Sequence, residues 1–487
     1  MGFVLRYYQE KSVNLAMNLL TEKTSKNRKG LIVLPTGAGK SIIIAELCKR
    51  LDGKVLVFQP STELLKQNVA KYKQVTDDAC SIFSASAGSK ELSHVTFATI
   101  GTVFKLGKDF KKFGFKYVII DEAHEVGVKR KSKDKPDSSS MYQKFFTDLG
   151  VKKVIGLTAT PFRNYIVGNR ESSHTESKFL TRTSPKFFNE VLYVVQNSEM
   201  VENGWWKKLD YKYYDVDNSP LQMSSTGRDY TIESLKDWAE RDELYEMLED
   251  CIDILINKKQ KKQIMVFLPS ISSCTTLQNR LGNDIATVIH GTLKPSERTQ
   301  VLEDFSNQKY KVIINCEVLT TGYDNSEIDA LIFARPTKSL SLYMQIIGRL
   351  VRVPKNPKME GLVIDFTNNV ETFGKVEDIT IEDIEGYGYG VFTKVVNKRG
   401  NKIITKLLTD VDIADEFDVT KEECIKRGKA IESMKAIPAK DFVLNIGKHS
   451  GEKISNVPIN YLLWFAENLS TKYPLVAKKI LDYLESI

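Results

Sequence analysis

Short apolar runs alternate with amphipathic stretches through the first third of the chain. The apolar runs occupy residues 30–35, 54–60, 94–99, 117–122 and 153–160. Runs of this length that are apolar on both faces are typical of buried parallel strands, and the stretches between them are typical of helices. The pattern therefore predicts a first sheet in which parallel strands alternate with helices.

A second series of the same kind begins further along the chain. Its apolar runs occupy residues 263–270, 285–291, 310–317, 329–336 and 361–366. Because the rhythm of strand and helix repeats, the chain is predicted to be an α/β protein with two parallel sheets in tandem. After residue 367 the rhythm stops, which indicates a small C-terminal accessory region.

The segments outside the two series have other patterns. Residues 164–189 form a polar tract with little apolar periodicity, and a helix is predicted from 231 to 256. Residues 391–408 predict a β-hairpin that turns at 398–401, followed by an acidic helical stretch to 436. We expect a first domain, a linker or insertion with a helix, a second domain, an accessory region and a compact C-terminal module, with bounds 1–165, 166–260, 261–370, 371–440 and 441–487.

Length and charge add little to this outline. At about 150 residues per domain, 487 residues predict roughly three domains. The chain has 70 Lys and Arg against 62 Asp and Glu, and this excess of +8 fits a polyanionic partner without establishing one.

The cysteines and the apolar segments exclude other classes of protein. The cysteines lie far apart and have no zinc-site spacing, so we expect reduced, mostly buried thiols and no zinc site. They are Cys48, Cys80, Cys251, Cys274, Cys316 and Cys424. No signal sequence is evident, and no apolar stretch approaches the roughly 20 residues of a membrane span. We therefore predict a soluble, cytoplasmic protein.

The first predicted strand ends in a glycine-rich phosphate-binding pattern. Residues 35–41, PTGAGKS, lead directly into the apolar stretch IIIAEL of a predicted helix. Two glycines allow the backbone N–H groups to face a phosphate, while Lys40 reaches the β- and γ-phosphates and Ser41 supplies a magnesium ligand. Leu34 stands where the pattern has glycine or alanine. A chance GKS loop is the alternative, which the flanking strand and helix disfavour. The predicted ATP-binding residues here are Pro35, Thr36, Gly37, Ala38, Gly39, Lys40 and Ser41.

A second motif, the acidic sequence Asp-Glu-Ala-His, lies at 121–124, at the end of the predicted strand 117–122. A carboxylate at the end of a strand beside the phosphate loop can hold magnesium, and the next can deprotonate the attacking water. Asp121 is the expected magnesium partner and Glu122 the expected catalytic base. An ordinary acidic strand end is the alternative, but the pairing with the phosphate loop favours the catalytic interpretation.

The motifs over residues 5–370 resemble those of superfamily 2 helicases and translocases in order and spacing. Besides the two patterns above they are LRYYQ (5–9), FQPSTELLKQ (58–67), FATIGT (97–102), LTATPFR (157–163), VFLPS (266–270), NCEVLTTGYDN (315–325) and QIIGRLVR (345–352). The resemblance implies two RecA-like domains with ATP and magnesium in the cleft between them.

The same resemblance implies roles for individual residues. Arg6 and Gln9 would read adenine, while Gln345, Arg349 and Arg352 would close on the γ-phosphate from the second domain. For the arginines, an exposed pair on one helix face is the alternative. Coupling of nucleotide state to domain movement is implied for His124, Thr158 and Thr160. Gly322 and Asp324 would touch ATP, and nucleic acid would be contacted by Ser61, Thr62, Thr99, Thr102, Ser270, Thr320 and Thr321. A turn or helix N-cap is the alternative for each hydroxyl residue taken singly.

Several departures from the RNA-unwinding DEAD-box pattern favour DNA as the partner. The chain has DEAH for DEAD, TAT for SAT, and QIIGRLVR at 345–352. MVENGWWKKLDY and LVIDFTNNVETFG resemble segments of bacterial and phage branch-migration and fork-remodelling helicases. We therefore expect an enzyme that unwinds or remodels forks, displacement loops or Holliday junctions, in a bacterial or phage-infected cytoplasm, with recombination or replication proteins as partners. The alternatives are an RNA helicase, or the motor subunit or ATP-controlled clamp of a restriction or nuclease complex.

Further nucleic-acid contacts are predicted outside these motifs. Trp205 and Trp206 either stack on bases or form a packed aromatic pair at the interdomain linker, which we favour. Basic candidates lie in the loop 129–135 and in the hairpin, at Lys394, Lys398, Arg399 and Lys402. The tail from Phe442 resembles a module appended to some exonucleases and helicases, with a basic turn at Gly447, Lys448, His449 and Gly451. In its apolar helix face, Tyr461, Leu462, Trp464 and Phe465, we expect Trp464 to lie in the core.

Overall fold

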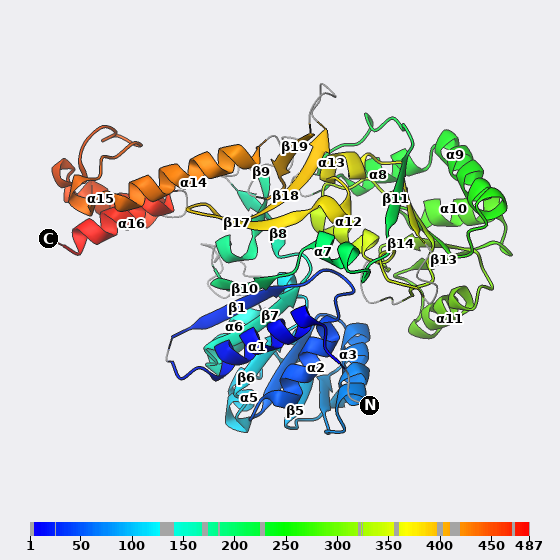
Figure 1. Ribbon diagram of the computed structural model, residues 1–487, viewed down its shortest axis with the longest axis horizontal. Helices are drawn as coiled ribbons and strands as arrows, with labels where there is room; N and C mark the ends of the chain where they lie inside the picture. Colours follow the sequence, from blue (N-terminus) through cyan, green and yellow to red (C-terminus); the bar gives the residue numbers. More distant parts are fainter. Residues whose placement is uncertain are drawn as a thin grey trace.

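The computed structural model places most of the chain in two α/β domains with parallel sheets, followed by a small antiparallel sheet and C-terminal helices, which confirms the predicted fold class (Figure 1). The residues it describes are 4–24, 26–126, 141–167, 174–183, 186–224, 229–319, 323, 325–354, 360–396, 403–409, 419–469 and 473–486. The basic loop 129–135 and the hairpin residues Lys398, Arg399 and Lys402 lie outside these ranges.

The first sheet has the strand order β10-β1-β7-β6-β2-β5-β3-β4, and all its pairs are parallel except β3 with β4. Its strands are β1 (Arg28–Val33), β2 (Val55–Gln59), β3 (Ser81–Ser84), β4 (Ser89–Lys90), β5 (Val95–Thr99), β6 (Tyr117–Ile120), β7 (Lys153–Thr158) and β10 (Glu190–Val194). Its helices are α1 (Tyr7–Thr21), α2 (Lys40–Arg50), α3 (Thr62–Val75), α4 (Ile100–Val103), α5 (Gly107–Phe113) and α6 (Met141–Leu149). Every strand predicted from the first series of apolar runs is confirmed, and β2 and β6 are buried along their whole length.

The second sheet is parallel throughout, in the order β11-β16-β15-β12-β14-β13. Its strands are β11 (Leu209–Tyr213), β12 (Ile264–Phe267), β13 (Ala286–His290), β14 (Val312–Cys316), β15 (Ala330–Phe333) and β16 (Gly361–Asp365). Its helices are α8 (Ile232–Ala239), α9 (Asp242–Asp253), α10 (Ile271–Leu281), α11 (Pro295–Ser306) and α12 (Leu340–Ile347). The second series of strand predictions is confirmed as well.

The segment between the two series takes part in both sheets. β10 lies at the edge of the first sheet beside β1, and β11 lies at the edge of the second beside β16. The short helix α7 (Asn197–Glu202) and the pair Trp205 and Trp206 stand between these strands. The chain therefore crosses from one domain to the other within residues 195–208.

Two expectations for this segment differ from the structure. The polar tract 164–189 contains an antiparallel strand pair, β8 (Phe162–Val167) with β9 (His174–Phe179). The single helix predicted over 231–256 is two helices, because Arg241 has an extended backbone and its guanidinium donates to the carbonyl of Trp238 near the end of α8. Asp242 and Glu243 then begin α9, where negative charge favours a helix start.

The predicted hairpin is confirmed as part of a three-stranded antiparallel sheet. β17 (Thr380–Ile384), β18 (Gly388–Val396) and β19 (Ile403–Leu407) form it, after the short helix α13 (Asn369–Phe373). This sheet is fastened to the first domain, since Gln196 exchanges two hydrogen bonds with the backbone of Ile381 and Arg182 donates to the carbonyl of Tyr387.

The C-terminal module has a hydrophobic core of its own. The helix α14 (Lys421–Ala436) carries the chain away from the accessory sheet, and α15 (Ile459–Leu469) and α16 (Pro474–Leu484) pack against each other beyond it (Figure 1). Phe442, Leu462 and Phe465 are among the buried residues of this core. Trp464, which we predicted to be buried, is 49% exposed. It lies two residues from Leu462, about 200° around a helix, and cannot share the buried face with Leu462 and Phe465.

The thiols are as predicted, since all six cysteines are free and only Cys80 among them is not fully buried. Of the described helices, none combines the length and the apolar character that crossing a membrane requires.

Candidate nucleotide site between the two sheets

The phosphate loop connects β1 to α2 at the carboxyl edge of the first sheet. Gly37 and Gly39 have left-handed φ angles of 78° and 84°, which side chains disfavour. Gly39 is the N-cap of α2 and provides no side-chain cap. The first N–H groups of the helix are therefore available to an anion, with Lys40 and Ser41 in the first turn.

Two side chains of α1 hold the back of this loop. The hydroxyl of Tyr8 and the amide nitrogen of Gln9 both donate to the carbonyl oxygen of Ala38, at 2.8 and 2.9 Å. The amide oxygen of Gln9 accepts the N–H of Arg6, whose exposed guanidinium lies 4.9 Å from the ring centroid of Trp205. Both polar groups of the Gln9 amide are thus used inside the protein, and a base-reading role for Arg6 and Gln9 stays a prediction.

Asp121 and Glu122 follow β6 directly and carry opposite pKa shifts. Burial raises the pKa of Asp121 to about 6, and the charge of Glu122 adds to the increase. Asp121 accepts hydrogen bonds from the side chain of Asn68 and from the backbone N–H of Glu122. Burial also opposes ionisation of Glu122, but the Lys40 ammonium, 3.3 Å away, and His124 outweigh it and hold the pKa of Glu122 below its ordinary value.

The backbone of Glu122 is strained. Its φ of 47° and ψ of 55° lie in the left-handed region, which costs a non-glycine residue roughly 1–3 kcal/mol. This conformation turns the chain sharply after β6 and brings the Glu122 carboxylate to Lys40. Such strain persists where the surroundings hold it, as they do at functional sites.

His124 joins the two domains through a chain of polar contacts. Its Nδ1 lies 2.9 Å from Thr158 Oγ1 and 3.4 Å from a carboxylate oxygen of Glu122. On its other side, Nε2 lies 3.5 Å from the amide nitrogen of Gln345 on α12 of the second domain. Thr158 Oγ1 also accepts the N–H of Thr160. The structure therefore connects all three residues that were predicted to couple the nucleotide state to domain movement with Gln345, which was predicted to contact the γ-phosphate.

The end of α12 lies against the phosphate loop. A Cβ added to Gly348 would stand 2.8 Å from the side chain of Thr36, and one added to Gly37 would stand 3.7 Å from Arg352. The indole N–H of Trp206 donates to the Thr36 carbonyl at 2.8 Å. Arg349 is buried, and its guanidinium donates to the carbonyl of Tyr323. The positive charge of Arg349 also helps to lower the pKa of Glu122. Arg349 and Arg352 are therefore held at the interface rather than on an exposed helix face, and Trp206 is a packed residue.

The predicted nucleic-acid contacts lie after strands on both domains. Ser61 and Ser270 are N-caps, accepting hydrogen bonds from the backbone of Leu64 and Ser273. Thr62 bonds Ser86, and Thr99 bonds Thr102. Their contact with nucleic acid stays a prediction. Thr320, Thr321, Gly322 and Asp324 lie outside the described residues.

Sequence reasoning did not find three of the residues that shape this site. Asn68 on α3 orients Asp121, Tyr8 supports the loop at Ala38, and Gly348 permits the approach of α12. All three lie in or beside the quoted motifs, but their residue types do not indicate which distant residues they contact.

The donor set fits a magnesium nucleotide. The uncapped α2 N-terminus and Lys40 suit phosphate oxygens, and the cradle is closed to side chains, since a Cβ at Gly39 would stand 2.5 Å from the Gln9 amide. Hydroxyl and carboxylate oxygens such as those of Ser41 and Asp121 are ligands that magnesium prefers.

Comparison with known proteins matches two segments of the chain to families. Residues 2–163 match the family "Type III restriction enzyme, res subunit", and residues 243–354 match "Helicase conserved C-terminal domain". The two matches cover the greater part of the two α/β domains, without their edge strands β10 and β11, and include the phosphate loop, the 121–124 motif and α12.

Individual relatives are distant. The chain is 25% identical over 385 residues to the Saccharomyces cerevisiae protein "Putative ATP-dependent helicase IRC3", covering 74% of this chain and 51% of that protein. It is 23% identical over 381 residues to "DNA 3'-5' translocase XPB2" of Sulfurisphaera tokodaii, covering 72% and 78%. The solved structure of the ATP-dependent type ISP restriction-modification enzyme LlaBIII bound to DNA aligns with a TM-score of 0.54 and 17% identity, over 75% of this chain and 28% of that one. The chain thus spans about half the length of the yeast relative.

Proposed function

We propose that this chain, which combines the two motor domains of superfamily 2 helicases, is an ATP-dependent DNA translocase or helicase that remodels branched DNA. One observation carries the proposal. The contacts from Lys40 through Glu122 and His124 to Gln345 connect the phosphate loop of one domain to α12 of the other. Through these contacts, hydrolysis or release of the nucleotide can alter the relative position of the two domains. A motor requires this coupling of nucleotide state to domain movement.

Each of the residues predicted for the nucleotide site has a defined role in the proposed reaction. Lys40 and the α2 N-terminus hold the phosphates, and Ser41 and Asp121 hold magnesium, which when bound neutralises phosphate charge. A phosphate beside Lys40 competes with Glu122 for the ammonium, and Glu122 is then free to accept a proton from water. Arg349 and Arg352, at the α12 end, supply positive charge from the second domain, so hydrolysis depends on the domains being closed.

DNA is the substrate we propose. The archaeal relative is named a DNA translocase and aligns over 78% of its length. The hydroxyl residues Ser61 and Ser270 follow strands of the two domains, and Thr99 is the last residue of β5. Contacts of this kind to phosphate and sugar bind a nucleic-acid strand without reading its sequence. Thr62, Thr102, Thr320 and Thr321 complete the proposed track.

The C-terminal module supplies a contact that favours branched DNA. Trp464 is half exposed, its ring 5.7 Å from Tyr461, which in turn lies 4.7 Å from His449 of the basic turn. The N–H of Lys448 donates to the Tyr461 hydroxyl, which ties the turn to the helix. An aromatic group beside a basic turn is suited to an unpaired base at a junction. Because α14 holds the module away from the motor domains, it can reach DNA that the track does not cover (Figure 1).

Replacing Trp464 with alanine should weaken binding to a three-way or four-way junction by about 5- to 150-fold, the equivalent of about 1–3 kcal/mol for one stacked base. ATP turnover on saturating linear duplex should not change. The matched control is Leu481→Ala, since Leu481 is 46% exposed on α16 of the same module. Junction affinity would be measured by fluorescence anisotropy, and equal losses for both variants would mean that the module is structural.

The direct test of the proposed function is steady-state ATP turnover with single-stranded DNA, duplex DNA, a Holliday junction and structured RNA at one salt concentration. We expect the junction to stimulate turnover most, because it offers both the track and the module a ligand. Stimulation by RNA alone would overturn the DNA assignment.

The family match of residues 2–163 favours a second candidate, the motor subunit of a restriction or nuclease complex. Such a subunit would translocate on duplex DNA without preference for a junction. Equal stimulation by duplex and junction, with no strand separation, would favour it.

A further inference from the structure

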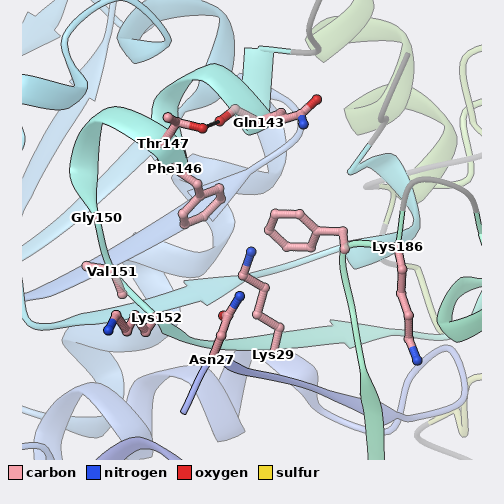
Figure 2. A pocket seen from close by; sticks show the side chains of 10 residues that line it. Asn27, Lys29, Gln143, Phe146, Thr147, Gly150, Val151, Lys152 and Lys186 are labelled. Carbon is pink, nitrogen blue, oxygen red and sulfur yellow. Dashed lines mark hydrogen bonds between the residues drawn. The ribbon is translucent and has the colours of Figure 1, made fainter. Parts of the chain in front are cut away.

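A cavity of about 350 Å³ lies far from the phosphate loop, at the start of two strands of the first sheet (Figure 2). It is lined by Lys29 near the start of β1, by Lys152 just before β7, and by Phe146 on α6. Parallel strands begin at one edge of a sheet and end at the other, so this cavity and the phosphate loop lie at opposite edges. Nothing in the proposed motor reaction uses it.

Lys29 is the centre of this cavity. Its ammonium lies 4.2 Å from the ring centroid of Phe187 and 5.9 Å from that of Phe146, so the two rings hold it by their faces. Figure 2 shows the Lys29 side chain rising toward the ring of Phe146. Burial lowers the pKa of Lys29, because the site removes water from the ammonium without supplying a carboxylate.

The surroundings leave the cavity strongly positive. Lys152 and Lys186 are exposed on its rim, and Figure 2 shows them on opposite sides of Lys29. A Cβ at Gly150 would stand 3.4 Å from the ammonium of Lys111, which places a fourth cation nearby. Of the described acidic residues, the two beside the start of β1, Glu22 and Glu190, both pair with Arg28. Within the described part of the chain, Lys29, Lys152 and Lys186 have no ion pair.

We propose that this cavity is a second phosphate-binding site, which takes the phosphate groups of a nucleotide or of a nucleic-acid strand. One phosphate lies beside Lys29 at the ring pair, where a charge-assisted hydrogen bond satisfies the ammonium. The flexible arms of Lys152 and Lys186 hold the phosphates that follow. A single carboxylate would leave most of this positive charge unmatched, whereas a chain of phosphates spans it.

The proposal is tested by calorimetric titration of variants that all carry Lys40→Ala. This substitution weakens binding at the phosphate loop, so that binding at the cavity can be measured separately. The probes are inorganic pyrophosphate, AMP and a short dT strand. One test variant adds Lys152→Gln and Lys186→Gln, whose side chains are exposed and whose loss leaves the core intact. A second adds Lys29→Met. The matched control adds Lys54→Met, since the Lys54 ammonium lies 3.8 Å from the Phe113 ring in the same domain but outside the cavity.

We expect each test variant to lose about tenfold or more in affinity for at least one probe, while the control stays within about twofold. A loss for pyrophosphate and AMP alone identifies a free nucleotide as the ligand, and a loss that includes the dT strand identifies nucleic acid. Unchanged affinity for all three probes in the Lys152→Gln, Lys186→Gln protein overturns the proposal. Because binding and not turnover is measured, the result is independent of whether the chain proves to be a motor.

Discussion

Replacing Lys40 with alanine is expected to lower DNA-stimulated ATP turnover by about 100- to 1,000-fold, the loss that follows removal of one preorganised charge at a reacting group. Lys40 is the cation of the phosphate loop, and its ammonium already lies 3.3 Å from Glu122, so it stands where phosphate charge would develop. Nucleotide affinity should fall as well, because the same charge holds the ground-state phosphates. Steady-state turnover and titration with a fluorescent nucleotide measure the two effects.

The control for this substitution is Lys49→Ala, an exposed lysine near the C-terminal end of the same helix. It should leave turnover within about twofold, since surface charges away from a site contribute little. Both variants should unfold at temperatures close to that of the parent, because neither side chain belongs to the apolar core. A Lys40→Ala protein that turns over ATP normally would remove the phosphate-site assignment.

The central strands were predictable because they are apolar on both faces. β2 and β6 are buried at every position, and their runs stand out in the sequence. β10 and β11 were not predicted as strands, for different reasons. β11 is an edge strand in which only Tyr211 is fully buried, so it has no continuous apolar run. β10 has an apolar run at 191–194 (VLYV), but this edge strand is only partly buried and follows the polar tract directly, and its run was assigned to the linker. The segment that was predicted to be a linker therefore also supplies one edge strand to each sheet.

In the candidate site, too, features set by local sequence were predictable, and contacts between residues distant in the sequence were not. The order of Gly37, Gly39 and Lys40 between a strand and a helix is a local pattern, and the structure has that arrangement. The hydrogen bond from Trp206 to Thr36 joins residues 170 positions apart, and no spacing rule indicates it. The error at Trp464 has another origin, because it was grouped with Leu462 by composition although helical geometry separates them.

Glu122→Gln is expected to lower turnover by about 100- to 10,000-fold, the contribution of a positioned general base, while nucleotide affinity stays close to that of the parent. The amide keeps the shape of the carboxylate but cannot take a proton from water. Since Lys40 and His124 hold the pKa of Glu122 below its ordinary value, the residue is in its basic form at neutral pH, as a base must be. The two substitutions thus differ in kind, because Lys40→Ala weakens both binding and turnover.

Glu125→Gln is the matched control that separates proton transfer from charge alone. Glu125 Oε1 lies 3.4 Å from His124 Nε2, and Glu122 Oε2 lies 3.4 Å from Nδ1 of the same ring, so each substitution removes one carboxylate charge beside His124. Glu125 does not contact Lys40 among the described ion pairs, and its side chain is 59% exposed. If Glu122 is the base, Glu125→Gln should change turnover by less than about tenfold, a loss of about 1.4 kcal/mol. Equal losses in the two variants would mean that both carboxylates act by orienting His124, and the base would then have to be sought elsewhere.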